Sequence, residues 1–118
     1  MATLEQLALA ALSGDALGVR SLAQDWLREN PRLANAPRPA SESPDVLALS
    51  AALVELFAER AGQPAPAWTR DIGGVAEPRF LVRAAMTMRR LRRACELESP
   101  PPLRRRNLFA PADYLSFA

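Results

Sequence analysis

Apolar residues recur at helical spacing in four stretches of the chain. The first two, residues 3–13 and 15–30, are separated only by a short break at Gly14, with Asp15 as a candidate N-cap. A connection this short predicts an antiparallel helical hairpin. The stripe of the third stretch, 44–61, is broad, which is typical of a central, mostly buried helix. A fourth helix is predicted over 77–97.

Prolines separate these stretches and shape the C-terminal end. Loops are expected at 31–43 and 62–76, and the three prolines from Pro100 to Pro102 end the fourth helix. No alternating strand pattern is present, so the predicted fold is all-α, a small bundle of about four helices. Residues 1–98 are expected to form the bundle. Residues 99–118 add a proline-ordered, extended tail of the same domain, with a short last helix from Pro111 to Phe117.

Charge is divided unevenly along the chain. The segment 79–106 carries nine of the fifteen arginines and only two carboxylates, Glu96 and Glu98. Its net charge is about +7 by this count, against about −5 for the rest. Such a split favours binding to a polyanion, to an acidic protein, or to the acidic half of the same chain.

The sequence of 118 residues lacks side chains that several kinds of chemistry require. There is no His, no Lys and one Cys, so neutral-pH acid–base catalysis, Schiff-base chemistry and a disulfide framework are not expected. We predict a chain that is not an enzyme and has no catalytic residues, metal or cofactor. No signal peptide or membrane span is evident, so the expected location is the bacterial cytoplasm, without a membrane partner.

The predicted fourth helix is the first candidate binding surface. Its apolar positions, including Phe80, Met88 and Cys95, share one arc, and arginines fill the rest. The partner-binding candidates on it are Arg83, Arg89, Arg90 and Arg93. The alternative is a solvated face partly neutralised by Asp45, Glu55 and Glu59. Cys95, on the apolar arc, is expected to be an inert core thiol.

The tail is the second candidate. Prolines pre-order it, and charges lie beside apolar anchors, as in an interface hot spot. The candidate residues are Arg104, Arg105, Arg106, Asn107 and Phe109. In the alternative interpretation, Leu103, Leu108 and Phe109 pin the tail to the bundle. Under the interface hypothesis the tail is removable after Glu98 without loss of helical structure.

Two motifs in the second half resemble a known group. They are the segment 66–71, which contains Trp68, and the closing run Glu98-Ser99-Pro100, Arg104-Arg105-Arg106-Asn107-Leu108-Phe109 and Asp113-Tyr114-Leu115. They resemble small uncharacterised bacterial proteins that look like antitoxin-type accessory partners, encoded beside a nucleotidyltransferase-like protein. Trp68 either caps the core or covers a binding groove.

These observations lead to two functional hypotheses. The first is a non-enzymatic, antitoxin-like interaction protein that binds an acidic protein through the Arg-rich helix and tail. The alternative is a nucleic-acid-binding regulator that uses the Arg face of helix 77–97. The one short hairpin has only Arg20 and Arg28 on its second helix, which disfavours a helix-turn-helix reader. Self-association is left open.

Overall fold

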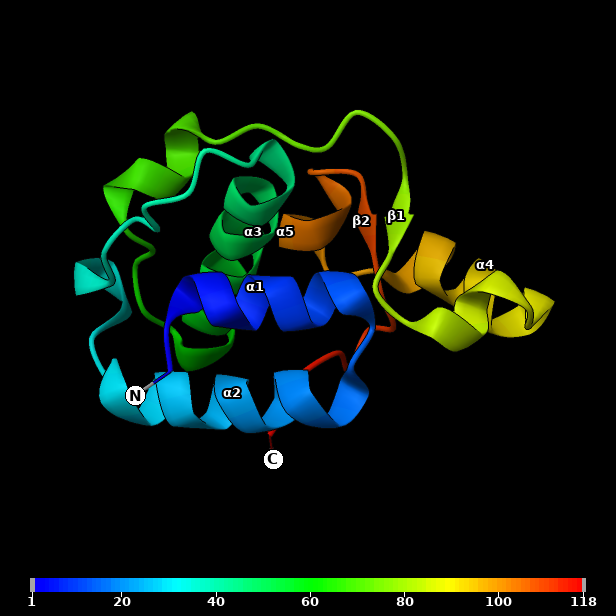
Figure 1. Ribbon diagram of the computed structural model, residues 1–118, viewed down its shortest axis with the longest axis horizontal. Coiled ribbons are helices and arrows are strands. Elements are labelled where there is room, and N and C mark those ends of the chain that lie inside the picture. The colour runs from blue at the N-terminus through cyan, green and yellow to red at the C-terminus, as the bar shows by residue number, and fades with distance from the viewer. Residues whose placement is uncertain (1, 118) are drawn as a thin grey trace.

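The helical hairpin forms where the sequence predicts it. In the computed structural model, which describes residues 2–117, α1 (Leu4–Ser13) and α2 (Ala16–Glu29) pack side by side (Figure 1). Thr3 and Gln6 form a reciprocal capping box at the start of α1. Gly14 ends α1 with φ 77°, a left-handed conformation that favours glycine. Asp15 caps α2 by accepting a hydrogen bond from the Gly18 amide at 2.9 Å.

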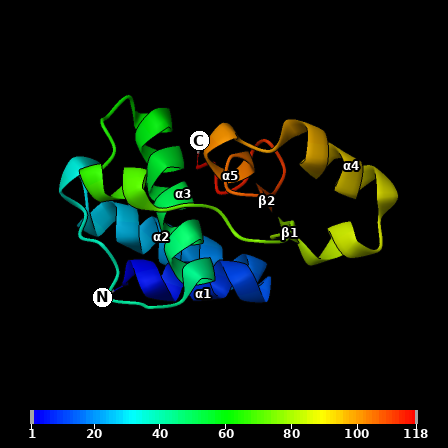
Figure 2. The same cartoon turned by 90° about the horizontal axis from the view of Figure 1, so that it is seen from above.

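The third helix, α3 (Pro44–Ala61), is the buried centre of the molecule. Ser43 caps its start, Pro44 occupies the first turn, and Gly62 ends it with φ 65°. Leu49, Leu53 and Val54 are completely buried. The helix packs against α1 on one side and against α5 (Pro101–Arg104) on another, as Figure 2 shows from above.

The prediction of a single helix over residues 77–97 is wrong. Instead, β1 (Arg79–Phe80) is followed by a 3₁₀ helix, η3 (Arg83–Met86), and then by α4 (Arg89–Glu98). β1 pairs in parallel with β2 (Leu108–Phe109); the Leu81 amide donates to the Phe109 carbonyl at 2.9 Å. Local helix propensity is a weak prior, and backbone pairing with a distant segment overrides it here.

The predicted form of the tail is also wrong in two places. Pro101 and Pro102 start α5 instead of continuing an extended chain, because the fixed φ of proline suits the first turn of a helix. The predicted helix over 111–117 is a turn at 112–115. Arg60 holds this turn by donating to the carbonyl oxygens of Tyr114, at 2.7 Å, and Ala112, at 3.3 Å.

The remaining elements are two short 3₁₀ helices in the proline-rich loops, η1 (Leu33–Asn35) and η2 (Ala67–Asp71). η2 packs on α3 and carries Trp68, whose indole Nε1 donates to the Ala36 carbonyl at 2.8 Å. The fold is therefore an all-α helical bundle with one very short parallel strand pair. Across the described residues, no helix is both long and apolar enough to cross a lipid bilayer.

One part of the chain stands apart from the bundle. η3 and α4, residues 83–98, lie at one end of the long axis, and α4 packs mainly on η3 (Figures 1 and 2). We call residues 83–98 the η3–α4 arm. Five of the nine arginines of the segment 79–106 lie on this arm, and all five are exposed.

Candidate functional site

Arg106 lies inside the fold, although the sequence suggested it as a partner-binding residue. Its guanidinium forms a two-pronged ion pair with Glu55 of α3, one contact being Nη2 to Oε2 at 3.2 Å. It also donates to the backbone carbonyls of Thr69, at 2.9 Å, and of Ile72 and Pro102, both at 3.3 Å. These acceptors belong to α3, η2, the following loop and α5. Arg106 therefore joins four parts of the chain.

Burial and the neighbouring donors have opposite effects on the pKa of Glu55, and Arg106 is the largest of the contributions that lower it. Burial by itself would raise the pKa of Glu55, but the hydrogen bonds and charge of Arg106 outweigh it. Arg105, at 3.3 Å, adds a further lowering contribution. The pKa of Glu55 is therefore below its ordinary value, and this carboxylate is charged at neutral pH.

The other tail candidates also contact their own chain. Asn107 adopts φ 64° and its amide nitrogen donates to the Val75 carbonyl at 3.4 Å. The Phe109 ring stacks on Phe80, with ring centroids 5.4 Å apart. Arg104 donates to the Leu97 carbonyl at 3.3 Å. The tail thus docks on the bundle of the same chain, as the pinning alternative describes.

Arg83 also has an internal partner. Its Nε and Nη2 atoms donate to the Ser13 carbonyl, at 3.1 and 2.8 Å, at the C-terminal end of α1. Arg79 adds a bond to the Leu12 carbonyl at 3.3 Å and an ion pair with Asp45. The last turn of α1 has no basic residue of its own, so these two side chains supply positive charge where the helix dipole is negative.

Three of the predicted arginines remain together and without partners. Within residues 2–117, the guanidinium groups of Arg89, Arg90 and Arg93 make no hydrogen bond, ion pair or cation–π contact. At about 100° per residue, these three side chains and Leu97 fall on one face of α4. Arg92 belongs to a different face, where it pairs with Glu96 at 3.2 Å and lies over the Phe80 ring.

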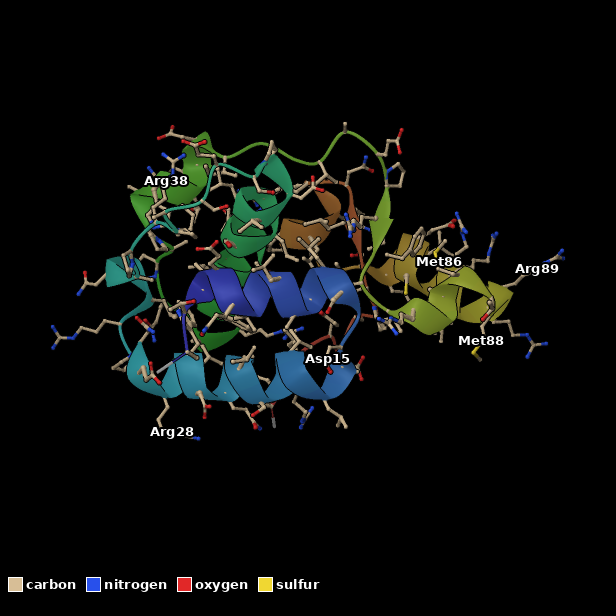
Figure 3. All side chains as sticks on the ribbon, viewed as in Figure 1. Asp15, Arg28, Arg38, Met86, Met88 and Arg89 are labelled. Atoms are coloured by element: carbon tan, nitrogen blue, oxygen red, sulfur yellow. The ribbon has the colours of Figure 1, made fainter. Side chains whose placement is uncertain are left out.

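Exposed methionines accompany these arginines, and the sequence analysis missed them. Met86 is 64% exposed and Met88 is 56% exposed. Figure 3 shows Met88 and Arg89 pointing away from the rest of the molecule. Met88 was expected on the buried arc of a continuous helix, but the chain breaks at Thr87 and Met88 becomes the N-cap of α4. The exposure of Met88 could have been predicted only by placing the helix break at Thr87.

The start of α4 is unusually basic. Met88 offers no side-chain cap, Arg89 and Arg90 occupy the first turn, and no acidic residue lies beside them. Cations at a helix N-terminus are unfavourable, because the partial charge of the helix dipole is positive there. The first turn of α4 is therefore electrostatically unfavourable, and a negatively charged partner would offset its positive charge.

The remaining candidates have structural surroundings. Trp68 packs against the hydrophobic core and is half-buried, as expected of a residue that caps the core. Cys95 is fully buried, and burial raises the pKa of its thiol, so the reactive thiolate is disfavoured. In the described part of the chain, no three Cys, Asp or Glu side chains are grouped so that they could hold a metal ion.

No protein-family model, curated protein or solved structure matches this chain. Within the described residues, the η3–α4 arm presents three arginines without partners and two exposed methionines at one end of the molecule.

Proposed function

We propose that this protein is a non-enzymatic interaction protein that binds an acidic protein partner through the η3–α4 arm. The observation that carries the proposal is the unpartnered trio Arg89, Arg90 and Arg93 on a helix that projects from the bundle. The other arginines of segment 79–106 are engaged with carbonyls, carboxylates or an aromatic ring of the same chain. The proposed binding surface is thus narrower than the whole basic segment.

Exposed apolar side chains favour a protein over a nucleic acid as the partner. Met86, Met88 and Leu97 are each more than half exposed beside the arginines. Flexible methionines and arginines are common at protein interfaces, where apolar area is buried along with charge. A phosphate backbone would use the arginines and leave the methionines in water. The antitoxin-like role and the cytoplasmic location suggested by the sequence remain parts of this proposal.

The proposal is tested with a triple variant of the arm, Arg89→Gln, Arg90→Gln and Arg93→Gln. Its matched control replaces Arg32, Arg38 and Arg70 by Gln, because these three are also exposed and removing them changes the net charge equally. Binding is measured by fluorescence anisotropy to a glutamate-rich peptide and to DNA, single-stranded and duplex, at several salt concentrations. We expect the arm variant to lose peptide binding, by at least about tenfold, and the control to keep it.

Two results would contradict the proposal. Equal losses in the two triple variants would show that net charge, not the arm, drives binding. Tighter binding to DNA than to the peptide, with a steep decline as salt rises, would assign the arm to nucleic acid. Co-purification with the co-expressed product of the adjacent gene, lost in the arm variant alone, would support the antitoxin-like role.

A further inference from the structure

A small pocket lies at the base of the η3–α4 arm. Its volume is about 260 Å³, and it is bounded by the α1–α2 corner, the segment entering η3, and the C-terminal turn. The side chains that define it include Ala16, Val19, Leu81, Arg83, Ala84 and Tyr114. Ligand pockets for small molecules usually measure about 300–1,000 Å³, so this one is better matched to a single side chain.

The walls of this pocket offer almost no free polar group. The Tyr114 hydroxyl is buried and has no hydrogen-bond partner in the part of the chain that the structure describes. Because that oxygen is inaccessible, Tyr114 offers no hydroxyl to an occupant of the pocket. Burial also raises the pKa of Tyr114, so the phenol stays neutral. Two nitrogens of Arg83 are already bonded to the Ser13 carbonyl. An apolar occupant therefore suits the pocket.

Exposed apolar residues lie close in the chain to residues that line the pocket. Leu17, next in the chain to the lining residue Ala16, is 82% exposed. On the other side, Met86 follows the lining residue Ala84 by two positions, and Arg89 follows Met86 by three. The chain thus runs directly from an apolar pocket, through exposed methionines, to the free arginines.

We propose that this pocket receives one apolar side chain from the acidic partner, so that the docking segment carries an apolar anchor followed within a few residues by carboxylates. This inference rests on the proposed function, because the carboxylates are those that meet Arg89, Arg90 and Arg93. Charge complementarity with the arm selects an acidic protein segment as the occupant. The pocket accounts for the apolar residue in the segment of the partner that is recognised.

The test uses synthetic peptides with one Leu and a run of four Glu, separated by two to five Gly or Ser residues. A second set replaces Leu by Ala, and a third replaces Glu by Gln. Amide chemical shifts and dissociation constants are measured on the full chain. We expect the Leu–Glu peptide of best spacing to shift the amides of Ala16 and Ala84 together with those of α4. The Ala set should bind at least about tenfold more weakly, as loss of one buried Leu side chain implies.

A variant of the protein provides the reciprocal test. Ala16→Leu enlarges a solvent-exposed lining residue and should fill the pocket without disturbing the core, which a thermal melt verifies. Its matched control is Ala61→Leu, at an exposed position at the end of α3. We expect Ala16→Leu to bind the Leu–Glu peptide as weakly as the unmodified protein binds the Ala set, and Ala61→Leu to bind normally.

The outcomes separate the two proposals. If the Leu and Ala peptides bind equally and shift only α4, the pocket has no role, but the arm still binds acidic segments. If the Gln peptides bind as well as the Glu peptides, charge is not recognised and the proposed function itself fails. If no peptide of any spacing binds, both proposals are overturned.

Discussion

At the scale of single residues, the arginines of this chain differ according to which oxygen atoms surround them. Arg105 and Arg106 are neighbours in a run of three, and charge alone gives no reason to distinguish them. Their side chains are 63% and 8% exposed. The difference arises because Arg106 reaches Glu55 and three carbonyls that only the folded chain assembles. The run of three arginines is visible in the sequence, but its division into surface and interior residues is not.

The first prediction concerns this division. Arg106→Met keeps an unbranched, largely apolar side chain but removes the guanidinium donor from a largely buried carboxylate and three carbonyls. Breaking a buried pair in this way costs about 3 kcal/mol of unfolding free energy. Arg105→Met, its control, should cost less than about 1 kcal/mol because Arg105 is mostly exposed. Urea denaturation of both variants measures the difference, and similar midpoints would refute the structural role of Arg106.

The second prediction follows from the lowered pKa of Glu55. Its ordinary pKa is 4.5 and its pKa in the folded chain is lower, so the unfolded chain takes up the proton first as pH falls. The stabilisation is fully present above pH 4.5 and is lost as pH falls through the folded pKa. Glu55→Gln should therefore be destabilising at pH 7, with a difference from the unmodified protein that shrinks below pH 4.5.

Urea unfolding of the two proteins at pH 7 and at pH 3 measures that difference directly. The comparison removes the contributions of the other carboxylates, because both chains share them. A difference that stays constant between the two pH values would show that the carboxylate charge of Glu55 is not what stabilises the fold.

At the scale of elements, the helices predicted correctly are those whose capping residues lie directly beside them in the sequence. A capping side chain precedes each of α1, α2 and α3, namely Thr3, Asp15 and Ser43. A glycine ends α1 and α3. These signals are local, so the sequence contains them. The prediction for 77–97 was wrong because β1 forms only through its pairing with residues 107–109, and no local signal in the sequence marks that partner.

The third prediction concerns α4, which lacks such boundary signals. Met88 already has the extended N-cap backbone, with φ −105° and ψ 103°, but its side chain accepts no hydrogen bond. Met88→Ser should supply the missing cap and stabilise α4 by about 1 kcal/mol. Slower amide hydrogen exchange within α4 would report this. The control is Met86→Ser, at a methionine that is also more than half exposed, and a matching effect there would contradict the capping explanation.

At the scale of the whole molecule, the candidate surface was predicted only in part. Of the arginines predicted to bind a partner, Arg89, Arg90 and Arg93 are exposed in the structure, whereas Arg83 and Arg106 have partners within the same chain. Internal partners depend on long-range packing, which residue counts do not encode. The sequence left two alternatives for the tail, a separable binding segment or a segment pinned to the bundle, and in the structure the tail completes the core.

The last prediction concerns deletion of residues 99–118. Leu103, Leu108 and Ala110 are completely buried, and Arg106 joins the tail to α3. Removing them exposes the face of α3 that α5 covers, so the truncated chain should lose its cooperative thermal transition by circular dichroism. Leu103→Ala in the full chain should keep that transition and lose about 2–5 kcal/mol. A truncated chain that melts as sharply as the full chain would restore the separable tail as a candidate binding segment, in competition with the η3–α4 arm.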